Sequence, residues 1–210
     1  MQLLAGQFGA ILADPPWPYA TYSVKGKGRS VEAHYNTMSI EAIAKLPVAQ
    51  WALPDCVLFL WITKPNLPRA FEVIRAWGFD YKTNAFVWVK TYPKIGDALF
   101  ELSHRYFFGL GHWTRSNPEQ CLLATRGRPQ RLAKDVPELI VAPIRQHSRK
   151  PDEIYDRIER LVAGPFLELF ASGEAQPRRD WTRWVGEDRP PRRRWKSNSY
   201  PGADDAAASA

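Results

Sequence analysis

Apolar residues in this chain fall into short runs of strand length, separated by segments with a helical period. The runs contain few polar interruptions, which is typical of strands buried on both faces of a parallel sheet. They predict strands over residues 8–13, 56–62, 85–90, 120–125, 139–142 and 166–170.

Two segments with apolar residues three and four positions apart predict helices. Residues 65–77 carry one apolar face and are followed by Gly78, which favours a helix end. Residues 151–162 begin with a proline, which the first turn of a helix tolerates. A shorter helical pattern over residues 39–51 is interrupted by Pro47.

Alternating strand and helix patterns predict an α/β domain with a mostly parallel sheet and helices on both faces. In such sheets, ligands bind beyond the carboxyl ends of the strands, where the strand order reverses. Asp14 follows the first predicted strand, and residues 168–173 end the last one. We therefore expect these two segments to meet in one crevice. Residues 18–37 and 91–118 are irregular stretches long enough to be functional or disordered.

Composition supports one folded domain of good size. The chain has 210 residues, of which 45% are hydrophobic and 13% aromatic. Its two cysteines, Cys56 and Cys121, lie in apolar runs and predict buried free thiols in a reducing compartment. No signal peptide or membrane-spanning run is found, so we expect a cytoplasmic protein without membrane contact. The four histidines show no metal-ligand spacing, and no metal is expected.

The net charge of +7 is unevenly placed. Residues 189–210 contain five basic and two acidic residues, so this Pro- and Ala-rich tail carries +3. We expect a disordered tail there and a folded domain over residues 1–188. A basic tail attracts phosphates in a salt-sensitive way, although solvated basic tails without a partner are also common.

The sequence Asp14-Pro15-Pro16-Trp17 comes directly after the first predicted strand. Consecutive prolines have nearly fixed φ and no backbone N–H, so we expect a rigid turn. The Asp14 carboxylate and the Pro15 carbonyl are then acceptors beside the flat surface of Trp17, which suits a flat amine such as adenine. Asp-Pro-Pro is also an ordinary turn sequence, and a neighbouring tryptophan is more often a core residue.

Residues 168–173 combine a carboxylate, Glu168, with an aromatic residue and a small flexible pair, Ser172 and Gly173. Small residues let the backbone approach a ligand closely, and a carboxylate can hold an amine or a hydroxyl. A plain exit from a strand is the alternative. The sequence contains neither a P-loop nor a G-x-G-x-x-G motif.

Several motifs follow one another along the chain. They are Ala13-Asp14-Pro15-Pro16-Trp17, Tyr35-Asn36-Thr37-Met38-Ser39, Phe59-Leu60-Trp61-Ile62-Thr63, Val87-Trp88-Val89-Lys90-Thr91, Gly111-His112-Trp113, Glu119-Gln120-Cys121-Leu122, Lys150-Pro151-Asp152-Glu153-Ile154-Tyr155 and Glu168-Leu169-Phe170. In sequence and order they resemble those of the Asp-Pro-Pro-Trp adenine-N6 methyltransferases. That family includes the catalytic subunit of the eukaryotic messenger-RNA adenosine writer, and its bacterial and phage members modify DNA.

This resemblance implies a Rossmann-like, S-adenosylmethionine-dependent methyltransferase fold with a permuted motif order, the catalytic strand first and the cofactor strand last. It also implies that Asp14 and the Pro15 carbonyl accept the two N–H hydrogens of the adenine amine. The lone pair of the amine is then localised and aimed at the methyl group. Pro16 would be a rigid spacer and Trp17 a stacking face.

The resemblance further gives substrate contacts to Tyr19, Tyr35 and His112. A base paired in a duplex cannot reach such a crevice, so the target adenine must be flipped out or single-stranded. Contacts with S-adenosyl-L-methionine are implied for Asp14, Lys150, Pro151, Glu168, Leu169, Phe170, Ser172 and Glu187.

Two of these positions depart from the family pattern. Ser172 stands where the messenger-RNA writer has a basic residue, and Glu187 stands where many members have asparagine. Glu187 could still accept hydrogen bonds from ribose hydroxyls, as acidic residues do in other nucleotide sites.

The expected activity is adenine-N6 methylation of nucleic acid, with DNA favoured over RNA. The preference for DNA rests on the compact layout, which lacks the additional RNA-binding modules of the eukaryotic writer. A cytosine-N4 methyltransferase is an alternative, but related enzymes usually carry serine where Asp14 stands. A catalytically silent nucleic-acid-binding subunit is another, although it would be expected to lose Asp14 or the prolines. A homodimer or a heterodimer is compatible with the sequence.

Overall fold

The computed structural model describes residues 6–18, 37–92, 106–109, 111, 113–145, 149–171 and 178–185. The tail predicted over residues 189–210 lies outside this part of the chain.

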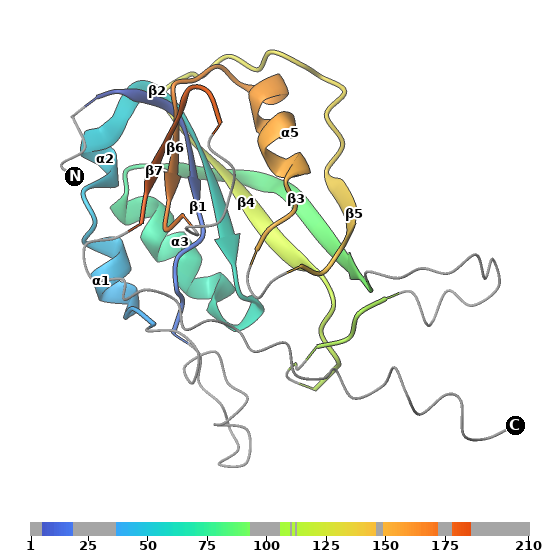
Figure 1. Ribbon diagram of the computed structural model, residues 1–210. Coiled ribbons are helices and arrows are strands. Elements are labelled where there is room, and N and C mark those ends of the chain that lie inside the picture. The colour runs from blue at the N-terminus through green and yellow to red at the C-terminus, as the bar shows by residue number, and fades with distance from the viewer. Residues whose placement is uncertain are drawn as a thin grey trace, which may run out of the picture.

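A seven-stranded sheet forms the centre of the described part, in the order β5-β3-β4-β2-β1-β6-β7 (Figure 1). β4 runs antiparallel to both of its neighbours, and every other neighbouring pair is parallel. The predicted α/β fold with a mostly parallel sheet is therefore confirmed. The strands are β1 (Phe8–Ala13), β2 (Ala52–Ile62), β3 (Asp80–Thr91), β4 (Glu119–Arg126), β5 (Leu139–Pro143), β6 (Phe166–Leu169) and β7 (Trp181–Trp184).

Helices cover both faces of the sheet (Figure 1). Alternate residues of β1 and β2 divide between two apolar clusters, one beneath α1 and α3 and the other beneath α5. The helices are α1 (Ile40–Ala44), α2 (Val48–Trp51), α3 (Leu67–Ala76), which follows a 3-10 turn (Lys64–Asn66), and α5 (Glu153–Leu161).

Two helix boundaries lie where the sequence predicts them. Pro47 separates α1 from α2. Gly78 follows the end of α3 with a φ of +79°, a conformation that glycine adopts at little cost. Cys56 and Cys121 are buried free thiols. Within the described ranges, no helix has both the length and the apolar character needed to cross a membrane.

The element boundaries differ from the predicted ones where strands carry polar residues. β2 begins at Ala52 rather than at 56, and β3 begins at Asp80 rather than at 85. These added residues include exposed polar ones, which pair through the backbone and leave no apolar signal. β7 was not predicted, since Thr182 and Arg183 interrupt its apolar pattern.

The strand order reverses at β1. The connection from β1 to β2 carries α1 and α2 across one face of the sheet, whereas α5 packs on the other face before the chain enters β6. β1 pairs in parallel with both β2 and β6. The carboxyl ends of β1 and β6 therefore meet at a switch point, where ligands of open α/β sheets bind.

Candidate functional site

Asp14 lies at this switch point, directly after β1. Its backbone N–H donates to the carbonyl of Leu169 at 3.4 Å, which joins the end of β1 to the end of β6. The predicted meeting of Asp14 with the segment that begins at residue 168 is thus confirmed. β4 runs antiparallel to β2 and β3. Its first residue, Glu119, therefore lies at the carboxyl ends of these two strands.

The two prolines form a tight turn, and the carbonyl group of each accepts a backbone hydrogen bond. Trp17 N–H donates to the Pro15 carbonyl at 2.8 Å, and Met38 N–H donates to the Pro16 carbonyl at 2.8 Å. The first of these bonds closes a three-residue γ-turn around Pro16. This donor was not expected from the sequence. A carbonyl oxygen has a second lone pair, however, so Pro15 can accept another hydrogen bond.

Trp17 belongs to the core rather than to an open surface. Only 3% of the residue is exposed, and its indole N–H donates to the Trp61 carbonyl at 2.8 Å. A ring so deeply packed offers little area to a base, so its position favours the core interpretation over the stacking face. Trp17 fixes the turn to the end of β2.

Lys150 joins the carboxylates of two strands. Its Nζ lies 2.7 Å from Asp14 Oδ2 and 3.2 Å from Glu119 Oε2. Glu119 Oε1 lies 2.6 Å from Nζ of Lys90, near the end of β3. The Lys150 side chain is 13% exposed and that of Asp14 is 31% exposed, so the carboxylate remains open to a ligand while the ammonium group is mostly covered.

The charges of this cluster stabilise one another. Burial alone would raise the pKa of Glu119, but Lys150 and Lys90 outweigh it and lower the pKa to about 2. Burial alone would lower the pKa of Lys150, but Asp14 and Glu119 hold it above its ordinary value. Lys150 therefore remains protonated at neutral pH and acts as a hydrogen-bond donor, not as a base.

Two tryptophans lie beside the cations of the cluster. Lys150 Nζ is 5.3 Å from the centre of the Trp61 ring, and Lys90 Nζ is 5.2 Å from that of Trp88. The Trp61 indole nitrogen is buried and has no hydrogen-bond partner within the described residues. Sequence analysis did not single out Lys90 or Glu119. The available signal was their position as charged residues within otherwise apolar motifs.

Glu168 is already engaged by the protein itself. Its Oε1 accepts from the Tyr155 hydroxyl at 3.0 Å and its Oε2 from Arg183 Nε at 3.0 Å. Burial raises the pKa of Glu168, and Arg183 offsets this only in part. The carboxylate ties α5, β6 and β7 together, so a direct contact with a ligand would require one of these bonds to be exchanged.

The structure describes three of the other predicted cofactor residues, Leu169, Phe170 and Pro151. Leu169 and Phe170 are buried, and Phe170 turns the chain out of the sheet with a φ of +62°. Pro151 is buried just before α5. Five predicted site residues lie outside the described residues, namely Tyr19, Tyr35, His112, Ser172 and Glu187.

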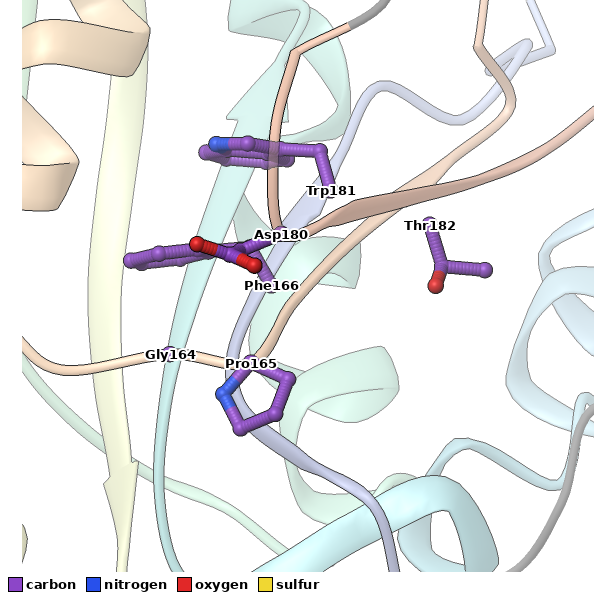
Figure 2. Close-up of a pocket in the computed structure, with 6 residues that line it drawn as sticks. All are labelled: Gly164, Pro165, Phe166, Asp180, Trp181 and Thr182. Carbon is purple, nitrogen blue, oxygen red and sulfur yellow. The ribbon is translucent and has the colours of Figure 1, made fainter.

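A recess elsewhere on the sheet is separate from this cluster (Figure 2). It lies at the starts of β6 and β7, whereas Asp14 lies at the end of β1. Phe166 and Trp181 stack in its wall with ring centres 4.9 Å apart. Its lining residues are Gly164, Pro165, Phe166, Asp180, Trp181 and Thr182.

Comparison with known proteins identifies relatives of the whole domain. The MT-A70 family matches residues 8–187. The N(6)-adenosine-methyltransferase subunit METTL3 of Danio rerio is 34% identical over 172 residues, which are 80% of this chain and 26% of the relative. The human catalytic subunit METTL3 is 33% identical with the same coverage. This chain thus spans about a quarter of the length of these relatives.

A relative of more similar extent is the Type II methyltransferase M.MunI of Mycoplasma sp. It is 30% identical over 188 residues, which are 81% of this chain and 74% of the relative.

Proposed function

Because this chain belongs to the MT-A70 family, we propose that it transfers a methyl group from S-adenosylmethionine to the N6 amine of adenine in nucleic acid, with DNA favoured over RNA. The observation that carries this proposal is the position of Asp14. Its half-buried carboxylate lies at the switch point of the sheet, next to the carbonyl of Pro15. Two consecutive acceptors in a rigid turn match the two N–H hydrogens of an exocyclic amine.

The chain's own residues position the amine and stabilise charge. The nitrogen of adenine N6 is a weak nucleophile because its lone pair is delocalised into the ring. Asp14 and the Pro15 carbonyl, by accepting its hydrogens, localise this lone pair and fix its direction. When bound, S-adenosylmethionine supplies a methyl group on a positively charged sulfur. N6 would become positive on taking up the methyl group as the sulfur becomes neutral, and the Asp14 carboxylate would offset that charge until an N6 proton passes to solvent.

Lys150 supports Asp14 in this scheme. It holds Oδ2 at 2.7 Å, and within the described residues no hydrogen bond engages Oδ1. Asp14 can thus keep its orientation through one oxygen and offer the other to the amine. Since Lys150 remains protonated, it orients the carboxylate and takes no proton from the substrate.

The residues at the switch point fit the proposed cofactor. The crossing connections at β1 and β6 create the position that nucleotide-like ligands use in open α/β sheets. Phe170 redirects the backbone there, and the ammonium group of Lys150 can pair with a carboxylate such as that of the methionine part. Asp14, Lys150, Pro151, Leu169 and Phe170 are therefore the described residues proposed to hold it.

The match to the Type II methyltransferase M.MunI, which is 30% identical over 188 residues, supports DNA. RNA is the second candidate, since the METTL3 relatives have the higher identities of 33–34%.

The test is to incubate the protein with labelled S-adenosylmethionine and unmethylated DNA or RNA, and to identify the modified nucleoside. We expect N6-methyladenine in DNA, and a fall of about 10²–10³-fold for Asp14→Asn, which keeps the shape but removes the charge. Asp135→Asn is the matched control, because its carboxylate is 74% exposed and pairs only with Arg160 in the described residues. The proposal would be contradicted if the product were N4-methylcytosine, if Asp14→Asn were as active as the wild type, or if no methyl group were transferred.

A further inference from the structure

One tryptophan differs from all the others that the structure describes. Trp113 has a relative exposure of 107%, so its whole side chain lies in water. The remaining described tryptophans are buried or half-buried: Trp17, Trp51, Trp61, Trp77, Trp88, Trp181 and Trp184. Tryptophan carries a large apolar surface and is highly buried on average, so full exposure indicates a role outside the fold.

The backbone at Trp113 also favours another residue. Its φ is +68°, a left-handed conformation that costs side chains with a Cβ and that glycine or asparagine adopts more easily. The nearby turn is tight, because a Cβ on Gly111 would lie 2.2 Å from the Thr114 carbonyl oxygen. Neither packing nor turn geometry therefore explains a tryptophan at this position.

Trp113 lies on a well-anchored support, the hairpin formed by residues 106–109 and 113–118. Gly109 N–H donates to the Ser116 carbonyl at 2.7 Å, and a further bridge joins Tyr106 to Thr91. The Asn117 side chain accepts from the Lys90 N–H at 3.1 Å and donates to the Lys90 carbonyl at 2.8 Å. The hairpin is thus fastened to the end of β3.

This support borders the proposed active site. The hairpin leads directly into Glu119, whose carboxylate pairs with Lys90 and Lys150, and Lys150 in turn holds Asp14. Figure 1 shows the hairpin as the light-green segment beyond the start of β4, at the edge where β3 ends. The hairpin that carries the Trp113 ring therefore lies at the same end of the sheet as the proposed active site.

We propose that Trp113 stacks on a nucleobase next to the target adenine and holds the strand while the target enters the site. This inference rests on the proposed function. An adenine that leaves its stack exposes the faces of neighbouring bases, and an aromatic ring can cover such a face without reading its sequence. The surroundings match a nucleic acid, because exposed Phe108 and Tyr92 add aromatic surface and exposed Arg115 adds a cation in the same region.

The test measures binding without S-adenosylmethionine, so it does not depend on methyl transfer. The probe is a short fluorescein-labelled DNA strand of mixed sequence, followed by anisotropy. We expect Trp113→Ala to weaken affinity by about tenfold and Trp113→Phe to retain most of it. Tyr81→Ala is the control, since Tyr81 is a 42% exposed aromatic residue near the start of β3, away from the site.

A second readout concerns the ring itself. Addition of unlabelled strand should quench the long-wavelength tryptophan emission of the wild type, and this quenching should be absent from Trp113→Phe although that variant still binds. Quenching that persists in Trp113→Phe would overturn the proposal.

The remaining outcomes separate this proposal from the proposed function. If Trp113→Ala loses affinity while the wild type methylates no nucleoside, stacking holds and the methyltransferase proposal fails. If the wild type methylates adenine and Trp113→Ala binds DNA as tightly, the stacking proposal is wrong. A change of the free protein from dimer to monomer in Trp113→Ala, seen by sedimentation, would assign the ring to a protein interface and would also overturn it.

Discussion

Trp17 and Trp113 lie at the same edge of the sheet and have opposite surroundings. Trp17 follows the proline turn, with 3% of its surface exposed and its indole N–H bonded to Trp61. Trp113 stands on the hairpin before β4 with its ring in water. The sequence motif indicated Trp17 as the stacking face, whereas Trp17 is buried and Trp113 is the fully exposed tryptophan among the described residues. A residue within a recognisable motif can therefore belong to the core that holds the site in place.

The difference extends to the neighbouring charges. The turn region is fixed by a partly buried network of Asp14, Glu119, Lys90 and Lys150, whereas the side chain of Trp113 is fully exposed. Its variants should therefore leave the fold intact, while variants of the turn region should weaken it.

The largest loss of stability is expected from Trp17→Ala. Loss of a buried indole should lower the free energy of unfolding by about 3–5 kcal/mol, measured by urea denaturation. Trp17→Phe keeps an aromatic ring and should lose less, since it mainly removes the hydrogen bond to Trp61. If Trp17→Ala is as stable as the wild type but binds nucleic acid less tightly, Trp17 is a stacking face and not a core residue.

An intermediate effect is expected from Glu119→Gln, and it depends on pH. The pKa of Glu119 in the folded protein is about 2, below its ordinary value of 4.5, so ionised Glu119 stabilises the fold. The stability advantage of the wild type over Glu119→Gln should be fully present above pH 4.5 and should be lost as the pH falls towards 2. Its upper size is about 3 kcal/mol. Urea denaturation at a series of pH values measures it, with Trp113→Ala as a control whose difference from the wild type should not change with pH.

The smallest effect is expected from Trp113→Gly. Glycine relieves the left-handed backbone, so the free energy of unfolding should stay equal or rise by up to about 1 kcal/mol. Trp113→Ala, which keeps a Cβ, should lie within about 0.5 kcal/mol of the wild type. A marked loss of stability in Trp113→Gly would mean that the ring packs against the protein in solution, contrary to its exposure.

The sequence predicted the fold well where burial leaves an apolar signal. Most of the strands, the long helices and the ends at Pro47 and Gly78 follow from hydrophobic period and backbone chemistry. The direction of β4 could not be predicted, because an apolar run reads alike in both directions. β7 was missed because its side chains are only half-buried and two of its four residues are polar.

For the candidate site, the sequence identified Asp14 and Lys150 but not Glu119 and Lys90, which complete the charged cluster. Glu119 has the form of an ordinary charged residue at the start of a strand, and only the reversed β4 brings it to Lys150. Exposure at Trp113 depends on how the hairpin stands away from the sheet, which no local pattern encodes. The tied state of Glu168 likewise depends on Tyr155 and Arg183, which reach it from α5 and β7.

The reversal of β4 has a consequence for how such a domain can diversify. In a fully parallel sheet, every loop at the binding edge follows a strand, and a change in its length also shifts the crossover that comes next. Here the hairpin precedes β4, and the register of that strand is set independently by its ladders with β2 and β3. Insertions or deletions between β3 and β4 can therefore change the length of this segment while the sheet and the Asp14 turn keep their geometry.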